Sequence, residues 1–437
     1  MADYGRIRRQ HSALGNGTLF GRRRRGVSPW FIAFWLLGVI IVGAVVWQFN
    51  TIQPRVLAMI GVPPTPTPTA VEFARRAEQA YWAGDLDAAV ENYRTAVLLA
   101  PTSVDILYEL VRVLIYRSYG DERNRADIGE ALEWAEQAAR VGPNNPRAHT
   151  IHCFALIRAR QSSDAIRACL RAIDMNPNDS ESHAYLSMAS FDLGRYSTAL
   201  SEAETAVRLN PNSLDGNSAF ARALSFQGRF GAALQHFENA IGVNPNLEFP
   251  YFELAFFAYT LANRNNGNEA QYRIAISAYN AVLDRNPNSV KAYTRLCQTY
   301  LAMGDPRQAR SYCQQAIQID PDYAPGWRWL GEVYHKSRNY EDAVDALQRC
   351  ADLSEAQGIP VDSRDSTCWW LRGVGYFILG RCEVALPILE DVLLWATDPI
   401  AVRETNRTIE KCATAYQGLY RTPTPVPTQT PRPTPIL

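Results

Sequence analysis

The sequence predicts an all-α protein, an αα-superhelix of helix–turn–helix repeats, from three regularities. Proline recurs at intervals of 42, 34, 34, 34, 42 and 34 residues, at Pro101, Pro143, Pro177, Pro211, Pro245, Pro287 and Pro321. An alanine stands twelve residues before each of these prolines, and a second small residue, alanine in all but one case, stands five before. Proline ends a helix because it lacks an N–H and its ring clashes with the preceding turn. A period near 34 residues with small residues at fixed helical positions is typical of a helical repeat array.

The proline spacing predicts nine repeats and one capping helix. The repeats begin at Ala70, Val104, Pro146, Ser180, Leu214, Glu248, Val290, Ala324 and Ser366. Repeats two and six have 42 residues, and the extra eight lie between their two helices, near residues 119–124 and 263–268. Eight residues are about one turn added to each helix, which keeps both in register. Residues 400–420 form a final helix whose polar outer face suits a cap, so the array covers residues 70–420. Because the long repeats are four units apart, residues 104–247 and 248–399 are interpreted as a duplicated module.

The eighth repeat carries the residues on which a family resemblance depends. Trp327, Leu330, Gly331, Tyr334 and Ala343 keep the order W-x2-L-G-x2-Y…A. Over the predicted array the chain therefore resembles the tetratricopeptide repeat family. The resemblance implies a right-handed superhelix of roughly seven or eight repeats per turn, hence slightly more than one turn here.

The N-terminal residues predict a membrane anchor. Residues 30–49 read WFIAFWLLGVIIVGAVVWQF and carry no charge, and twenty helical residues span about 30 Å, the thickness of the hydrocarbon core. Seven arginines lie in residues 1–29. By the positive-inside rule this basic tail stays in the cytoplasm and the array lies outside it, as in a single-pass cell-membrane protein. A cleaved signal peptide is the rival interpretation, against which the length of the apolar run argues.

Two segments rich in proline and threonine flank the predicted array. Residues 50–69 contain PPTPTPT, and residues 421–437 contain TPTPVPTQTPRPTP. Alternating proline favours extended polyproline II, so both segments are interpreted as spacers, the second as a disordered tail. Glycosylation of the threonines and recognition by a proline-binding groove remain alternatives.

The sequence contains no catalytic motif. It has no phosphate-binding glycine loop, no HExxH and no G-x-S-x-G. Its 44 basic and 44 acidic residues balance, which gives no general attraction for nucleic acid. His149, His152 and His183 have a spacing that could hold zinc, but they occupy packing positions of the repeat that the chain resembles. We therefore expect a protein that is not an enzyme and holds no cofactor or metal.

The resemblance implies a concave groove lined by the first helix of each repeat, chiefly at its second, fifth, sixth, ninth and twelfth positions. Large apolar residues at these positions form the predicted ligand-binding set: Tyr108, Phe154, Tyr185, Met188, Phe191, Phe252, Phe256, Tyr259, Trp329 and Trp370. The lysine and asparagine clamp with which similar grooves hold acidic chaperone tails is absent. Packing accounts for about half of the set, and the remainder favour a binding surface.

These observations predict a membrane-anchored, non-enzymatic scaffold whose groove binds a partner protein or extended peptide. Aromatic side chains suit such a groove because they give large contact area at low entropic cost. The alternative is a carbohydrate-binding or cell-envelope assembly module, in which the same rings stack on sugars.

Eight cysteines predict four disulfides. Antiparallel neighbouring helices place residues equidistant from their turn at the same level. The first two pairs take the eighth and twenty-fourth positions of repeats three and seven, and the other two straddle the turns on either side of repeat nine. The predicted bridges are Cys153–Cys169, Cys297–Cys313, Cys350–Cys368 and Cys382–Cys412. An extracytoplasmic array would oxidise these pairs, whereas the alternative is that each cysteine fills a small core position as a thiol.

Overall fold

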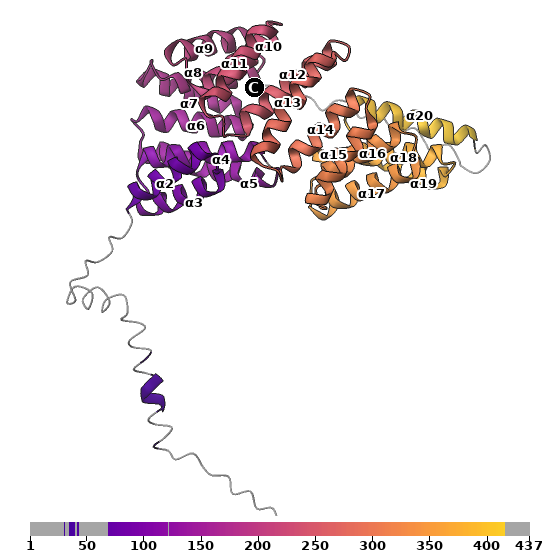
Figure 1. Cartoon of the computed structure of the whole chain (residues 1–437), viewed down its shortest axis with the longest axis horizontal. Helices are drawn as coiled ribbons and strands as arrows, with labels where there is room; N and C mark the ends of the chain where they lie inside the picture. Colours follow the sequence, from indigo (N-terminus) through magenta and orange to yellow (C-terminus); the bar gives the residue numbers. More distant parts are fainter. Residues whose placement is uncertain (1–29, 31–34, 40–41, 43–68, 121, 416–437) are drawn as a thin grey trace, which may run out of the picture. The chain divides into compact units, whose positions relative to one another are not determined.

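The computed structural model describes residues 30, 35–39, 42, 69–120 and 122–415. The chain divides into two compact units, Met1–Pro68 and Thr69–Leu437. In the second unit, helices follow one another in chain order from α2 to α20 (Figure 1), and its described residues contain no strand. The predicted all-α repeat solenoid is confirmed.

Each repeat is a pair of antiparallel helices. The first helices are α2 (Ala70–Ala83), α4 (Val104–Gly120), α6 (Pro146–Arg158), α8 (Ser180–Asp192), α10 (Leu214–Phe226), α12 (Phe249–Arg264), α14 (Val290–Ala302), α16 (Ala324–Lys336) and α18 (Thr367–Ile378). The second helices are α3 (Leu86–Leu99), α5 (Ala126–Val141), α7 (Ser162–Met175), α9 (Tyr196–Leu209), α11 (Phe230–Val243), α13 (Glu269–Arg285), α15 (Pro306–Ile319), α17 (Tyr340–Ala356) and α19 (Cys382–Trp395). The cap is α20 (Pro399–Ala415). Every predicted repeat start lies within one residue of a helix start.

Small residues allow the helices of the array to pack closely. The alanine twelve residues before each proline is fully buried in all seven repeats that have one, and so is the small residue five before. A larger side chain at either position would push two helices apart, because protein interiors are close-packed. Short polar side chains cap the helix starts. For example, the Asp179 side chain accepts a hydrogen bond from the Ser182 N–H, and the Ser213 side chain accepts one from the Gly216 N–H.

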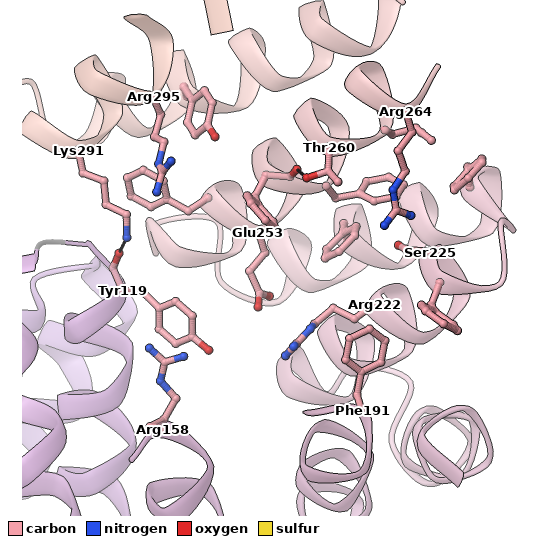
Figure 2. Close-up of a pocket in the computed structure, with 18 residues that line it drawn as sticks. Tyr119, Arg158, Phe191, Arg222, Ser225, Glu253, Thr260, Arg264, Lys291 and Arg295 are labelled. Carbon is pink, nitrogen blue, oxygen red and sulfur yellow. Dashed lines mark hydrogen bonds between the residues drawn. The ribbon is translucent and has the colours of Figure 1, made fainter. Parts of the chain in front are cut away.

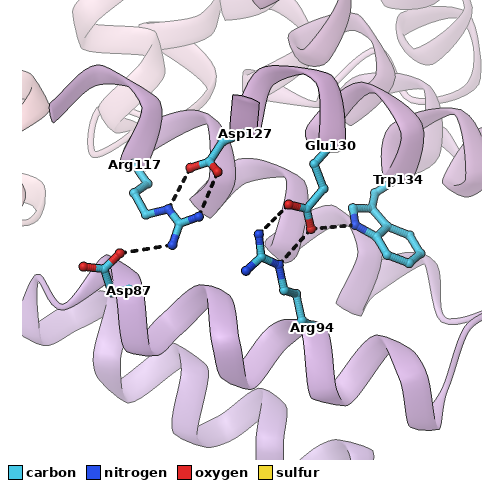
Figure 3. Close-up of polar contacts among 6 residues, drawn as sticks. All are labelled: Asp87, Arg94, Arg117, Asp127, Glu130 and Trp134. Carbon is cyan, nitrogen blue, oxygen red and sulfur yellow. Dashed lines mark hydrogen bonds and ion pairs between the residues drawn. The ribbon is translucent and has the colours of Figure 1, made fainter. Parts of the chain in front are cut away.

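The two long repeats contain longer helices. Helix α4 has 17 residues and α12 has 16, whereas the other first helices have 12 to 14. The extra turn of α4 is tied to its neighbours by charge (Figure 3). The Arg117 guanidinium donates to both carboxylate oxygens of Asp127 on α5, at 2.7 and 2.8 Å, and pairs with Asp87 on α3 at 3.0 Å. Beside it Arg94 pairs with Glu130.

A seam joins the end of repeat five and the start of repeat six to repeats one and two. The Asn244 side-chain amide donates to the Tyr81 carbonyl at 3.0 Å, and that of Asn246 donates to the Trp82 carbonyl at 2.9 Å. The ring of Phe249 on α12 stacks on Tyr116 and Tyr119 of α4, with centroids 4.4 and 5.2 Å apart. Tyr119 belongs to the extra turn of α4, so the two long repeats meet at this seam.

The first superhelical turn therefore closes on itself after five repeats, fewer than the resemblance implies. The physical reason is the size and apolarity of the inner face. Large side chains on α4, α6, α8 and α12 would face water in an open turn, and closure packs them together. At the centre, Tyr116 of α4 and Tyr185 of α8 both donate to Asp215 Oδ2 on α10, each at 2.7 Å.

All eight cysteines are joined in disulfides. The bridges are Cys153–Cys169, Cys297–Cys313, Cys350–Cys368 and Cys382–Cys412, with Cα–Cα distances of 5.3, 5.3, 5.8 and 5.7 Å. The structure thus joins the same four pairs that the repeat register predicts. Each bridge links two helices that are neighbours in the chain, which fixes local pairs rather than the closure of the turn.

The predicted membrane topology requires correction. A membrane-spanning helix needs about twenty consecutive, predominantly apolar residues, and within the described ranges no helix is long and apolar enough to cross a bilayer. On this finding the predicted single-pass anchor and the cell-membrane localisation are wrong. Most of residues 30–49, and all of residues 1–29, 50–68 and 416–437, lie outside the described residues.

Candidate functional site

A pocket of about 430 Å³ lies beside the seam, where the closed turn meets repeat seven. Its size falls within the usual range of ligand sites, about 300–1,000 Å³. Residues from α4, α6, α8 and α10 to α14 line it. Nine of the lining residues are aromatic: Tyr119, Phe191, Phe226, Phe230, Phe237, Phe252, Phe256, Phe257 and Tyr279.

The sequence of α12 explains why so many rings gather here. This helix reads FPYFELAFFAYTLANR, with Phe252 and Phe256 one turn apart on the same face. Phe252 is buried against Tyr279 of α13, whereas Phe256 is 61% exposed. Phe226, which ends α10 and also lines the pocket, is 48% exposed. The exposed rings give the pocket an apolar wall that faces solvent.

The charged residues of the pocket are predominantly basic. Five cations line it, namely Arg158, Arg222, Arg264, Lys291 and Arg295, against the single carboxyl group of Glu253. Two cations are held by the protein itself: Lys291 donates to the Tyr119 carbonyl, and Arg295 donates to the Gln298 side chain at 2.8 Å. Among the described residues the other three form no hydrogen bond, and Arg222 has only a longer ion pair, at 3.6 Å to Asp192.

Two arginines flank Glu253 in Figure 2. The Arg158 guanidinium carbon lies 3.9 Å from the Tyr119 ring centroid, and its buried Nε has no hydrogen-bond partner among the described residues. The Arg222 guanidinium lies 5.2 Å from the Phe191 centroid and 3.6 Å from an Asp192 oxygen. Glu253 projects from α12 toward the space between these two cation–ring pairs.

Glu253 is a buried carboxyl group whose hydrogen-bonding capacity is not filled. Its Oε2 is inaccessible to solvent and has no hydrogen-bond partner within the described ranges. Burial raises the pKa of Glu253, while Arg222 and the Ser218 hydroxyl oppose the shift. An unpartnered buried oxygen is costly, and the nearby charges of Arg222 and Arg158 offset part of that cost.

The pocket contains three of the ten residues predicted to bind a ligand: Phe191, Phe252 and Phe256. Tyr108, Phe154, Tyr185 and Met188 are instead buried in the core. Phe154 stacks on Tyr185 with centroids 4.2 Å apart. For these four the predicted groove is corrected, because closure of the turn removes the open surface that they would line.

The other three predicted residues lie outside the pocket lining and are half-buried. Tyr259 packs near Tyr272, with centroids 6.0 Å apart. The ring of Trp329 lies 3.8 Å from the Arg328 guanidinium carbon. Trp370 packs against the core of the last repeats, and its buried Nε1 has no partner among the described residues.

The charged residues of the pocket were not predicted, although the repeat positions of most of them could have identified them. Arg222 is at the ninth position of repeat five, Glu253 at the sixth of repeat six and Arg295 at the sixth of repeat seven. The same positional rule that selected the aromatic residues would have selected these. Arg158 lies one position beyond the rule, so only the structure places it in the pocket.

Two of the three histidines considered as metal ligands have hydrogen-bond partners in the protein. His149 Nε2 lies 2.9 Å from the Pro143 carbonyl oxygen, and His183 contacts the Pro177 carbonyl and the Glu202 carboxylate at 3.0 and 2.7 Å. In the described ranges no group of three or more histidine, cysteine or acidic residues is arranged to hold a metal.

Two family models, both described as tetratricopeptide repeat, match the chain. One matches residues 300–352, and the other matches residues 155–213 and 268–324. These segments of the chain carry tetratricopeptide repeats. The matched segments lie within the helical array, whose antiparallel helix pairs agree with this match.

Curated relatives match short parts of the chain. Hsp70-Hsp90 organizing protein 3 of Arabidopsis thaliana is 27% identical over 89 residues, which are 20% of this chain and 16% of that protein. Small glutamine-rich tetratricopeptide repeat-containing protein 2 of Mycosarcoma maydis is 28% identical over 97 residues, 21% of this chain and 28% of that protein. This chain thus covers less than a third of either relative's length.

A solved structure has the same fold over a longer stretch. A chain in the crystal structure of the APC/C hetero-tetramer Cut9-Hcn1 superposes with a TM-score of 0.52 and 16% identity. The match covers 74% of this chain and 59% of that one. At this identity the similarity concerns the fold alone.

Proposed function

We propose that this protein is a non-enzymatic scaffold that binds a partner protein by taking a peptide segment of that partner into the aromatic pocket. The single observation that carries the proposal is the solvent-facing aromatic wall, formed by Phe226 and Phe256 over buried rings. Partly exposed rings in a concave site are typical anchors for protein partners.

The tetratricopeptide repeats support a protein partner. One relative is named an organizing protein for Hsp70 and Hsp90, a name that concerns protein assembly. Neither relative's name supports carbohydrate binding, and no observation at the pocket favours sugars, so the carbohydrate alternative is not carried forward.

The test is selection of peptides from a random displayed library on the purified protein, followed by affinity measurement on variants. Phe256→Ser should weaken selected peptides about tenfold or more, because it removes the exposed ring that anchors them. It should leave the unfolding free energy almost unchanged, because the ring is mostly exposed.

The matched control is Leu98→Ser, on the outer helix α3. Leu98 is 76% exposed and lies outside the pocket lining, so this change also removes an exposed apolar side chain. Peptides that bind both variants as well as the unmodified protein would contradict the pocket as the binding site, and so would a library that yields no binder.

A further inference from the structure

The pocket combines an aromatic wall with an excess of positive charge, and this combination indicates the chemistry of its occupant. Resting on the proposed function, we propose that the bound segment is acidic, with a carboxylate side chain next to an aromatic or other large apolar residue. The apolar side chain packs on Phe226 and Phe256, and the carboxylate pairs with the guanidinium groups of Arg158 and Arg222.

The charge balance of the pocket is the first argument. Five cations face one carboxyl group, whereas the whole chain has equal numbers of acidic and basic residues. The excess is therefore local. Arginine prefers carboxylates because its planar guanidinium donates two parallel hydrogen bonds to them.

The availability of the arginines is the second argument. Among the described residues, no carboxylate forms an ion pair with Arg158; its guanidinium rests on the Tyr119 ring and acts on Glu253 at longer range. Arg222 has one ion pair, at 3.6 Å to Asp192. Both guanidinium groups rest on aromatic rings, which restricts them near the cavity without satisfying their donors.

The proposed function favours a peptide over a nucleic acid as the source of the negative charge, because it gives the pocket a protein partner. Glu253 lies between the two arginines (Figure 2), and its Oε2 is inaccessible to solvent. Burial raises the pKa of Glu253, and the charges of Arg222 and Arg158 oppose the shift, so this carboxyl group offsets part of their charge. Because the pocket has five cations and one carboxyl group, an excess of positive charge remains for an acidic side chain of the peptide.

The experiment uses an array of immobilised peptides with a central Phe, Trp or Leu flanked by Glu, Gln or Lys, all other positions being randomised. The full-length protein should bind the Glu-flanked set at least about tenfold more tightly than the Lys-flanked set, with the Gln-flanked set between them. The preference should weaken as salt rises, because exposed charges are screened.

Variants assign the preference to the pocket. Arg222→Gln and Arg158→Gln should each reduce the Glu-over-Lys preference about tenfold, while binding of the Gln-flanked set changes little. The control is Arg167→Gln on α7, whose side chain is 75% exposed and lies outside the pocket lining. Unfolding curves of all three variants show whether each is folded.

The outcomes separate this inference from the proposed function. Binding that depends on Phe256 but shows no preference for Glu, or that keeps its preference in both arginine variants, overturns the inference and leaves the scaffold proposal standing. A short single-stranded oligonucleotide is the competing probe. If it displaces bound peptides, or binds when no peptide set does, the assignment of an acidic peptide is wrong.

Discussion

Asp215 is the polar centre of an otherwise apolar closed turn. It lies on α10 and accepts hydrogen bonds from tyrosines on α4 and α8, so one carboxyl group contacts repeats two, four and five. Burial raises the pKa of Asp215, while the hydroxyl groups of Tyr116 and Tyr185 and the charge of Arg112 oppose the shift. The residue therefore fixes the packing of three repeats at some cost to stability when it ionises.

The raised pKa of Asp215 gives a pH prediction. An unfolded aspartate loses its proton near its ordinary pKa of about 3.9. Above that pH the folded protein binds more protons than the unfolded chain, so the contribution of Asp215 to stability is present in acid and is lost as pH rises through the folded pKa. Asp215→Asn cannot titrate, and its amide oxygen can still accept from both tyrosines.

We expect the unfolding free energy of Asp215→Asn, relative to the unmodified protein, to rise as pH increases from about 4, by at most about 1.4 kcal/mol per pH unit. Urea unfolding of both proteins at several pH values measures this difference. If the unfolding free energies of the two proteins change with pH in parallel, folding does not raise the pKa of Asp215.

At the scale of the helices, the extra turns in repeats two and six build the seam. The sequence predicts their position and the register of both helices, and the structure agrees. It does not predict that the two long repeats contact each other, since that contact joins residues about 130 positions apart in the chain and depends on the curvature of the whole turn. The spacing predicts a duplicated module, which stays a prediction, and the extra turn of α4 contributes to closure through the contact of Tyr119 with Phe249.

Replacing Gly84, which follows α2, by alanine adds a single methyl group at the seam and so tests its packing. The φ of Gly84 is +85°, and a Cβ added there would lie 2.4 Å from the Asn246 carbonyl oxygen across the seam. Gly304, which follows α14, has φ of +84° with nothing within 4 Å of an added Cβ. Both positions cost alanine about 1–2 kcal/mol for its left-handed backbone, but only Gly84→Ala also forces the seam apart.

Gly84→Ala should therefore reduce the unfolding free energy by at least about 1 kcal/mol more than Gly304→Ala does, the scale of overpacking at a tight contact. Denaturant unfolding of the two variants measures both losses. If they are equal, the end of repeat five does not press against α2.

At the scale of the whole molecule, closure of the superhelical turn determines which residues of the inner face are buried in the core and which line the pocket. The repeat rule predicts the inner face correctly as a set of positions, but position alone does not distinguish Phe154, which is buried, from Phe256, which is exposed. Both are large aromatic residues on first helices. What separates them is whether the closed turn covers them. Phe154 packs between Tyr116 and Tyr185 inside the turn, whereas Phe256 lines the pocket, where the inner face opens beside repeat seven.

The most direct test of the closed turn is hydroxyl-radical footprinting of the native protein, read by mass spectrometry at single residues. The account predicts that Phe154 and Tyr185 stay unmodified while Phe226 and Phe256 react, because exposure to solvent limits the reaction. The same four residues should all react after unfolding in urea, which controls for intrinsic reactivity. Modification of Phe154 and Tyr185 in the native protein at rates similar to that of Phe256 would mean an open superhelical groove, and would contradict the closed turn.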